Sequence, residues 1–434
     1  MELLRIEGGR RLEGQIPISG SKNATLPVMA ASLLTDQTIE IRNVPNIEDI
    51  GSMARMLQHL GVVVHQEDVH RWELRAATIR CADVGPDLSG RMRGSFLLFG
   101  ALVARFGEAA IAKPGGDDIG MRRVEQHLEG LRLMGAEVEE QSDSFVARAK
   151  KLRGARIDLD MPTVTGTENL MMAAVLADGI TVINNAAREP HVYDLARCLV
   201  GMGAHISGVG TELIVVEGAG RPLHGTTHSV TTDYIEAGTY MVIAAATLGD
   251  VTIDHMRPTD VRWLINKLRA AGCSIVEGAN HVRIRGASLR AVDVTTWPHP
   301  GFATDLQPQF GALMTQAKGT SVVSEALYEN RFRHVPELRK MGANISIEGR
   351  SSVIVGPTPL RGARVTVPDI RSGAALVCAG LCAEGVSELD NVFHIDRGYE
   401  DMDMKLRLLG ASCERVSSDE ADVKVRDLTG VIGD

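Results

Sequence analysis

At 434 residues the chain is longer than one hydrophobic core usually supports, so two domains are expected. The net charge of -9 argues against broad nucleic-acid binding, and no apolar run approaches the roughly 18 residues that span a membrane. Residues 1–11 lack the apolar centre of a signal peptide, so the composition predicts a cytoplasmic enzyme or binding protein.

A six-fold repeat organises the predicted elements. Each copy is a helix end, a glycine, a small residue and an apolar residue: QHLGVVV (58–64), RLMGAEV (132–138), VGMGAHI (200–206), RAAGCSI (269–275), RKMGANI (339–345) and RLLGASC (407–413). The glycines of these copies are 68 to 74 residues apart: Gly61, Gly135, Gly203, Gly272, Gly342 and Gly410. Each copy predicts a helix that ends at a left-handed glycine and is followed by a strand.

A second helix, rich in small residues, precedes the signature in each unit. Examples are LPVMAASLL (26–34), LMMAAVLA (170–177), MVIAAAT (241–247) and ALVCAGLCA (375–383). A strand such as TIEIRNV (38–44) or TVINNA (181–186) lies between the two helices. The chain is therefore predicted to be α/β, with six modules in two domains of three, because solenoid repeats are usually shorter.

The predicted hinge lies near GAGRPLHGTTH, residues 218–228. The opening strands before residue 20 could pair with either half. We assign residues 21–229 to the first domain and residues 1–20 with 230–434 to the second. The acidic start of the segment 417–434 predicts a flexible end.

The six cysteines show no Cys-x-x-Cys spacing and no neighbouring histidine cluster, so no metal site is expected. Cys378 and Cys382 are four residues apart in an apolar segment, which predicts that both lie on one buried helix face.

Several segments deviate from the repeat, and nearly all carry Arg, Lys or Asp beside glycine. They are SGSKNA (19–24), MRGS (92–95), PGGDDIGMRR (114–123), HPGFATDLQPQ (299–309), ENRFRHVPEL (329–338), VPDIRSG (367–373) and HIDRGYE (394–400). They predict a cationic pocket between the halves for an anionic substrate, with carboxylates that move protons.

In order and spacing these segments resemble the UDP-N-acetylglucosamine enolpyruvyl transferase family, in the superfamily that contains the shikimate-pathway synthase. The resemblance covers the chain except roughly its last fifteen residues. It implies two inside-out α/β barrels joined by a double hinge. It also implies transfer of the enolpyruvyl group of phosphoenolpyruvate to the 3-hydroxyl of UDP-N-acetylglucosamine, with release of phosphate, as the committed step of peptidoglycan precursor synthesis. It asks for no cofactor and no metal.

The resemblance assigns catalytic roles to Lys22, Asp117, Asp305 and Arg397. Phosphoenolpyruvate carries two anionic groups, which planar guanidinium groups suit. Its implied ligands are Lys22, Asn23, Arg122, Arg331, Arg371 and Arg397. Asp305 matches the presumed base for the sugar hydroxyl, although it could equally be the N-cap of a helix over LQPQFGALM.

The stretch from Lys113 to Gly130 is expected to be a lid that carries an acid and a phosphate clamp and is followed by a helix, with Gly115 and Gly116 supplying flexibility. Asp117 stands where the family usually has a cysteine that protonates carbon. An ordinary Asp pKa of about 3.9 must be raised for that task. Burial under the lid and the neighbouring Asp118 would raise the pKa of Asp117, whereas Arg122 would lower it. Because the epoxide fosfomycin alkylates the family's lid thiol, an enzyme with aspartate at this position is expected to resist the drug. The alternative to the lid interpretation is a surface turn capped by Asp117 or Asp118.

The positions that match the nucleotide-sugar site are Arg93, Arg122, Arg123, Val124, Glu125, Gln126, Thr163, Val164, Asp305 and Leu327. Arg123 replaces the family's usual proline and Glu125 its usual aspartate. Because of these two changes, one alternative is a paralogous transferase that acts on another nucleotide or nucleotide sugar. Because the lid cysteine is absent, a second alternative is a catalytically inactive paralogue that only binds a nucleotide sugar. His299, His334 and His394 lie in matched segments and are interpreted as structural or solvated groups.

Overall fold

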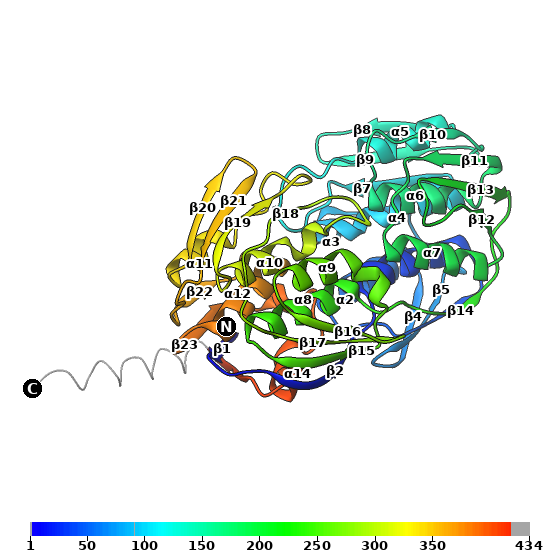
Figure 1. Cartoon of the computed structure of the whole chain (residues 1–434). Helices are drawn as coiled ribbons and strands as arrows, with labels where there is room; N and C mark the ends of the chain where they lie inside the picture. Colours follow the sequence, from blue (N-terminus) through cyan, green and yellow to red (C-terminus); the bar gives the residue numbers. More distant parts are fainter. Residues whose placement is uncertain (1, 91, 418–434) are drawn as a thin grey trace, which may run out of the picture.

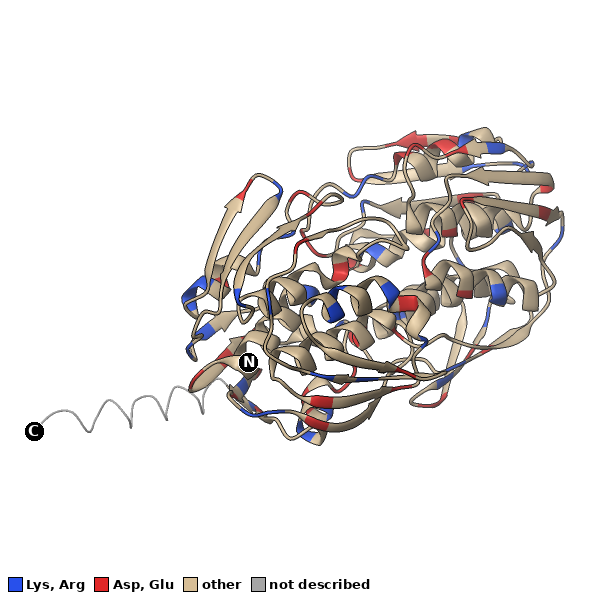
Figure 2. Ribbon diagram, in the orientation of Figure 1, with Lys and Arg blue, Asp and Glu red and all other residues tan. Residues whose placement is uncertain are grey.

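The computed structural model describes residues 2–90 and 92–417. Figure 1 shows helices in the interior and strands toward the outside. In Figure 2 most acidic and basic residues lie on outer strands, outer helices and loops. No helix in these ranges is long and apolar enough to cross a bilayer. Apart from Ser417, the end that was predicted to be flexible lies outside the described residues.

Six four-stranded sheets share one topology, in which a parallel pair is extended by two antiparallel strands. Three sheets are, in strand order, β14 (Thr226–Ser229), β3 (Thr38–Arg42), β5 (Arg71–Arg75) and β4 (Val63–Asp68); β6 (Asp83–Val84), β7 (Glu108–Ala112), β9 (Ser144–Arg148) and β8 (Glu137–Glu140); and β10 (Arg156–Asp158), β11 (Asp178–Asn184), β13 (Leu213–Ala219) and β12 (His205–Ser207).

The other three sheets are β16 (Ser274–Glu277), β17 (His281–Arg285), β15 (Asp250–Asp254) and β2 (Glu13–Pro17); β18 (Val294–Thr295), β19 (Gly319–Ser324), β21 (Ser351–Gly356) and β20 (Asn344–Glu348); and β22 (Arg364–Thr366), β23 (Val386–Asp390), β1 (Glu2–Glu7) and β24 (Ser412–Ser417). Burial alternates along the strands, since Ile39 and Ile41 of β3 are buried while Thr38 and Arg42 are exposed. One face of each sheet can therefore cover helices.

The helices covered by these sheets are the ones rich in small residues. They are α1 (Lys22–Ala31), α4 (Leu97–Phe106), α6 (Val164–Ala174), α8 (Tyr234–Ala246), α10 (Gln307–Met314) and α12 (Ile370–Cys382). Every residue of α8 is buried, as expected of a helix that is apolar on all sides. Small residues let such helices approach closely: a Cβ on Gly100 of α4 would lie 2.5 Å from the carbonyl oxygen of Asn169 in α6. The predicted α/β modules are confirmed, and the structure places the helices rich in small residues in the interior.

The signature helices lie outside this layer. They are α2 (Glu48–Leu60), α5 (Glu125–Leu133), α7 (Pro190–Gly201), α9 (Arg262–Ala270), α11 (Val335–Lys340) and α14 (Met402–Leu408). All six signature glycines are left-handed, with φ between +93° and +110°, which confirms the predicted helix ends. The short elements are η1 (Ser32–Leu34), α3 (Pro86–Ser89), η2 (Arg93–Phe96), η3 (Pro258–Val261), η4 (Thr304–Leu306) and α13 (Phe393–Asp396).

Two separate hydrophobic cores form. One contains residues from Ala24 to Val230 and defines what we call the first lobe. The other joins Leu4–Ile18 to residues 234–413 and defines the second lobe. We propose that these lobes are the two domains, divided close to the predicted boundaries 20/21 and 229/230, with Val230 still packed in the first core.

The chain crosses between the lobes twice, at residues 18–21 and 230–233. The two crossings are hydrogen-bonded to each other: the Ser21 N–H donates to the Thr231 carbonyl at 2.8 Å, and the Asp233 N–H to the Ser19 carbonyl at 2.9 Å. The hinge predicted at 218–228 lies too early, because β14 within it still pairs with β3.

The expectation for the cysteine pair of α12 holds for one member. Cys378 is buried, and hydrogen bonding with Cys382 together with burial raises the pKa of its thiol. Cys382 is only half-buried, because it is the last residue of the helix.

Candidate active site

All six interior helices begin at one cavity of about 620 Å³ between the lobes. Residues from their first turns, or from the short turns that lead into them, line it: Lys22, Leu97, Val164, Tyr234, Thr304 and Ile370. A helix N-terminus presents unpaired N–H groups and partial positive charge, which favour anions. The fold therefore directs six such ends at one space.

Basic side chains strengthen this anion preference. The cavity is lined by Lys22, Arg93, Arg122, Arg123, Arg331, Arg371 and Arg397. Arg331 and Arg371 are each only 3% exposed. Burial, followed by repulsion from Arg122, lowers the pKa of Arg93 to about 10. The predicted cationic pocket is present.

Asp49, in the first turn of α2, joins cations from both lobes. Its Oδ2 lies 3.3 Å from Lys22 Nζ, and its Oδ1 accepts from Arg397 Nε at 3.0 Å. Arg397 Nη1 also donates to Asp117 Oδ1 at 2.6 Å. Burial alone would lower the pKa of Arg397, but attraction to Asp49 and Asp117 raises it. Asp49 thus fixes both cations beside the lid.

The expectation of a raised pKa for Asp117 is wrong for the arrangement in this structure. Burial favours the protonated form, but attraction to Arg397 and then Lys22 outweighs it and lowers the pKa. The cation that chiefly lowers the pKa of Asp117 is therefore Arg397, and not Arg122 as the sequence had suggested. Arg122 Nη2 instead donates to the Asp117 carbonyl at 2.8 Å, and Asp118 accepts from Asn330 at 3.1 Å.

Asp305 lies in η4 and faces two buried guanidinium groups. Arg331 Nη2 donates to its Oδ1 at 2.7 Å, and Arg371 Nη2 to its Oδ2 at 3.1 Å. Burial would raise the pKa of Asp305, yet Arg371 and Arg331 hold it well below its usual range. The helix-cap alternative is wrong, because α10 has Leu306 as N-cap and no side-chain cap.

The lid is docked onto the second lobe. The Met121 N–H donates to Glu329 Oε1 at 2.6 Å, and the Asn330 N–H donates to the Ile119 carbonyl at 3.1 Å. Neither Asp117 nor Asp118 caps α5, whose N-cap Val124 makes no side-chain cap bond. The simple capped-turn interpretation of this segment is therefore wrong.

The residues matched to the nucleotide sugar line the same cavity with one exception. Those that line it are Arg93, Arg122, Arg123, Glu125, Gln126, Thr163, Val164, Asp305 and Leu327. Val124 instead packs into the first core and is only 7% exposed. Arg123 is exposed and contacts the Met121 sulfur at 3.3 Å, so its guanidinium is available to a ligand. Asn23 lies at the wall as well.

Sequence reasoning missed several lining residues: Asp49, Met161, Glu168, Glu189, His191, Tyr234, Trp297 and Tyr328. Their local sequences are ordinary, and only the pairing of distant segments brings them together. Burial raises the pKa of Glu168 well above its usual range and so favours the uncharged form of this acid.

The three histidines of the matched segments differ in position. His299 lines the cavity, and its backbone N–H donates to Glu189 Oε1 at 3.3 Å. His334 is 1% exposed. Burial is the main cause that lowers the pKa of both rings to about 4, and it also lowers the pKa of His394. The first two rings are therefore neutral at physiological pH.

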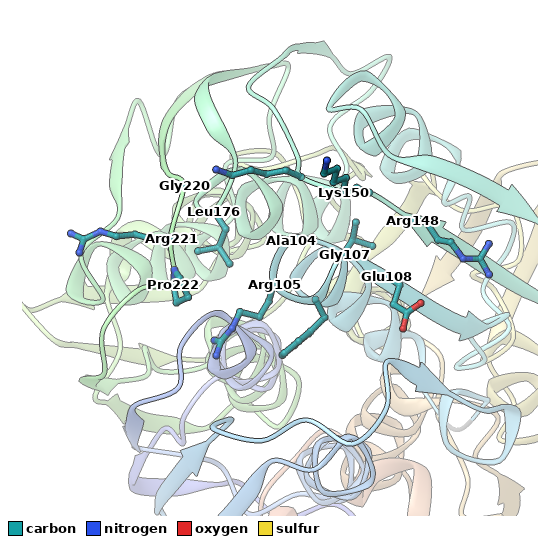
Figure 3. Close-up of a pocket in the computed structure, with 14 residues that line it drawn as sticks. Ala104, Arg105, Gly107, Glu108, Arg148, Lys150, Leu176, Gly220, Arg221 and Pro222 are labelled. Carbon is teal, nitrogen blue, oxygen red and sulfur yellow. The ribbon is translucent and has the colours of Figure 1, made fainter.

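A second hollow, of about 500 Å³, lies at the opposite end of the first lobe's interior helices. Its wall includes Gly107, just after α4, and Leu176, just after α6, so it receives the negative ends of these helices. Figure 3 shows Arg148 and Arg221 extending in opposite directions. Without convergent polar groups it does not compete with the cavity between the lobes.

Comparison with known proteins agrees with this geometry. Residues 6–406 match the family described as EPSP synthase (3-phosphoshikimate 1-carboxyvinyltransferase). The chain is 47% identical to the UDP-N-acetylglucosamine 1-carboxyvinyltransferase of Magnetococcus marinus, over 96% of this chain and 100% of the relative. It is 48% identical to UDP-N-acetylglucosamine 1-carboxyvinyltransferase 1 of Carboxydothermus hydrogenoformans, over 97% and 100%.

Two solved structures share the fold. The enolpyruvyl transferase NikO from Streptomyces tendae superposes with a TM-score of 0.86 at 25% identity, covering 96% of this chain and 99% of that one. EPSP synthase from Acinetobacter baumannii superposes with a TM-score of 0.73 at 19% identity, covering 96% of this chain and 100% of that one. The two inside-out α/β barrels expected from the sequence are confirmed, and the chain belongs to the UDP-N-acetylglucosamine 1-carboxyvinyltransferase family of enolpyruvyl transferases.

Proposed function

We propose that this chain transfers the enolpyruvyl group of phosphoenolpyruvate to the 3-hydroxyl of UDP-N-acetylglucosamine and releases phosphate, the committed step of peptidoglycan precursor synthesis. The observation that carries the proposal is the pair Lys22 and Arg397, held by Asp49 beside the lid carboxylate, with Asp305 in the same cavity. The curated relatives named above support this acceptor.

Phosphoenolpyruvate binds among polar side chains, all but one of them cationic, that both lobes contribute. Lys22, Asn23 and Arg122 come from the first lobe, while Arg331, Arg371 and Arg397 come from the second. A phosphate dianion and a carboxylate together need several such partners, and guanidinium groups bind each in a bidentate manner. Binding of the ligand therefore draws the lobes together.

The reaction needs one base and one acid. The sugar 3-hydroxyl oxygen bonds to C2 of phosphoenolpyruvate and gives up its proton, while C3 gains a proton. Loss of phosphate from C2 and of a proton from C3 then restores the double bond. Asp305 is the base in this proposal, and Arg371 and Arg331 keep it ionised by lowering its pKa. Because a lowered pKa by itself weakens a base, the proposal requires substrate binding to loosen one of these two ion pairs.

Asp117 is the proposed acid at C3. In this structure Arg397 and Lys22 stabilise its ionised form. A bound phosphate dianion would take over these cations and add negative charge nearby. Burial would then dominate and raise the pKa of Asp117, so that the acid becomes protonated when substrate is present. A carboxyl group in place of the lid thiol also makes the enzyme resistant to fosfomycin.

The nucleotide sugar lies along Arg93, Arg122, Arg123, Glu125, Gln126, Thr163, Val164 and Leu327 in this proposal. Arg123 supplies an additional phosphate contact. Neither nucleic acid nor membrane is proposed as a partner, in keeping with the net charge of -9. Both substrates are small metabolites, and we propose a cytoplasmic location.

Phosphate release tests the proposal. The wild type is mixed with both substrates across pH 5 to 9, beside Asp117→Asn and Asp305→Asn. Each variant should lose activity by a factor of about 100 or more, while Asp118→Asn, whose amide oxygen can still accept from Asn330, stays close to the wild type. Absence of phosphate from folded wild-type enzyme at every pH would reject the activity, and full activity of Asp117→Asn would reject the acid.

A further inference from the structure

Two neighbouring residues of the second lobe make three polar contacts with the lid backbone between residues 118 and 121. The Asn330 N–H donates to the Ile119 carbonyl, and Asn330 Nδ2 donates to the Asp118 carbonyl, each at 3.1 Å. Glu329 Oε1 accepts from the Met121 N–H at 2.6 Å. We propose that Glu329 and Asn330 form a latch that keeps the lid closed and act as positioning residues for the reaction.

The latch lies between two lid residues of the proposed mechanism, and the inference rests on that proposed role. Asp117 precedes the latched backbone and binds Arg397 at 2.6 Å. Arg122 follows it and holds the Asp117 carbonyl at 2.8 Å. Fixing the backbone of residues 118–121 therefore fixes the acid and one phosphate ligand together.

The same segment connects the lid to the base. Arg331 directly follows Asn330 and donates to Asp305 at 2.7 Å. Three consecutive residues thus contact the lid on one side and the proposed base on the other. The contact between Arg331 and Asp305 involves no lid atom, so the latch bonds hold the acid without themselves holding the base.

Gly120 gives an independent indication that lid and latch are fitted to each other. Its φ of +126° is a conformation that side chains rarely adopt. A Cβ at this position would lie 2.7 Å from the Glu329 carboxyl group and 3.0 Å from the Glu329 nitrogen. Only glycine lets the lid backbone reach Glu329.

Each latch bond is a reversible contact at the surface. A hydrogen bond exchanged with water contributes modestly, and one to a charged acceptor contributes more. The latch therefore biases the lid toward closure yet still allows substrate to enter. Glu329 should carry the larger share, because it is the charged acceptor, and Glu329→Gln keeps an oxygen acceptor at the same place.

Hydrogen exchange of the peptide 113–124 tests the latch directly, with and without UDP-N-acetylglucosamine. In Glu329→Ala the lid amides should exchange about tenfold faster than in wild type, and kcat should fall by about tenfold with a smaller change in KM. Glu329→Gln should recover most of both. Gly120→Ala should behave like Glu329→Ala. A peptide from the wholly buried α8 is the internal control for global unfolding.

Two results would overturn the latch. One is that the lid amides of Glu329→Ala exchange at the wild-type rate, and the other is that Glu329→Gln is impaired as strongly as Glu329→Ala. Failure of the proposed mechanism appears differently. If Asp117→Asn keeps full activity while Glu329→Ala still speeds lid exchange, the latch is supported and the acid is rejected. Because exchange requires no turnover, it decides the latch even if these substrates release no phosphate.

Discussion

Arg397 Nη1 donates to Asp117 Oδ1 at 2.6 Å while its Nε donates to Asp49 Oδ1 at 3.0 Å. One guanidinium of the second lobe thereby holds two acids of the first. Asp49 also approaches Lys22 at 3.3 Å and is only 4% exposed, so it acts as a fixed centre for both cations.

Asp49→Ala should raise KM for phosphoenolpyruvate by about tenfold, because Lys22 and Arg397 lose the acceptor that orients them. Asp49→Asn keeps one oxygen acceptor and should be affected less. Steady-state kinetics at fixed UDP-N-acetylglucosamine measures the effect. Glu48→Gln, at the exposed neighbouring position, is the matched control. An unchanged KM in the alanine variant would show that the cations are oriented without Asp49.

The contribution of Asp305 to stability should depend on pH. Because its pKa is lowered in the folded chain, its ion pairs stabilise the fold fully above the unfolded value of about 3.9 and lose that contribution as pH falls toward the folded value. Asp305→Asn should cost about 2 kcal/mol in the free energy of unfolding at pH 7, and less below pH 4. Urea unfolding of both proteins at pH 7, 5 and 3.5 measures this difference. A difference that grows on acidification would contradict the assignment.

Fosfomycin should not inactivate the wild type, because a carboxylate is a weaker nucleophile toward an epoxide than a thiolate. Asp117→Cys should retain turnover and become sensitive, with a covalent adduct on the lid peptide detected by mass spectrometry. Time-dependent covalent inactivation of the wild type would disprove the first expectation. A folded but inactive cysteine variant would argue against a shared role at this position.

Gly100→Ala should destabilise the first lobe by about 1–3 kcal/mol, because the added Cβ would lie 2.5 Å from the Asn169 carbonyl oxygen. Gly51→Ala in the outer helix α2 is the matched control. Its Cβ would only meet a flexible arginine head at 3.4 Å, so the change should be neutral or stabilising by about 0.5–1 kcal/mol. Urea unfolding measures both, and equal effects would contradict the close packing of α4 on α6.

Features with local signals could be predicted from the sequence. Glycine ends a helix because it adopts the left-handed conformation at little cost, and this preference acts within a few residues. All six signature turns could therefore be predicted from the sequence. The second helix of each unit was also predicted from its small residues, whereas its interior position followed only from the family resemblance. Val124 was assigned to the ligand because it stands among polar neighbours, but as the N-cap of α5 it faces the core.

Features made by distant pairing could not be predicted. Asp49 stands in an ordinary helix start, and its partner Arg397 is 348 residues away. The sign of the Asp117 pKa shift depends on whether burial, which raises the pKa, outweighs attraction to Arg397 and Lys22, which lowers it. That balance depends on distances between groups that are far apart in the sequence. Glu329 meets Met121 across 208 residues, for which a local pattern carries no signal.

The paired crossings between the lobes also restrict how the molecule can move. Two adjacent segments paired at the bridge between Gly20 and Thr232, with hydrogen bonds from Ser21 to Thr231 and from Asp233 to Ser19, behave as a short flat ribbon. Such a ribbon bends easily in one direction but resists twisting and sideways shear. The lobes should therefore open and close like a book, along one arc that returns Arg397 to the same acids at every cycle.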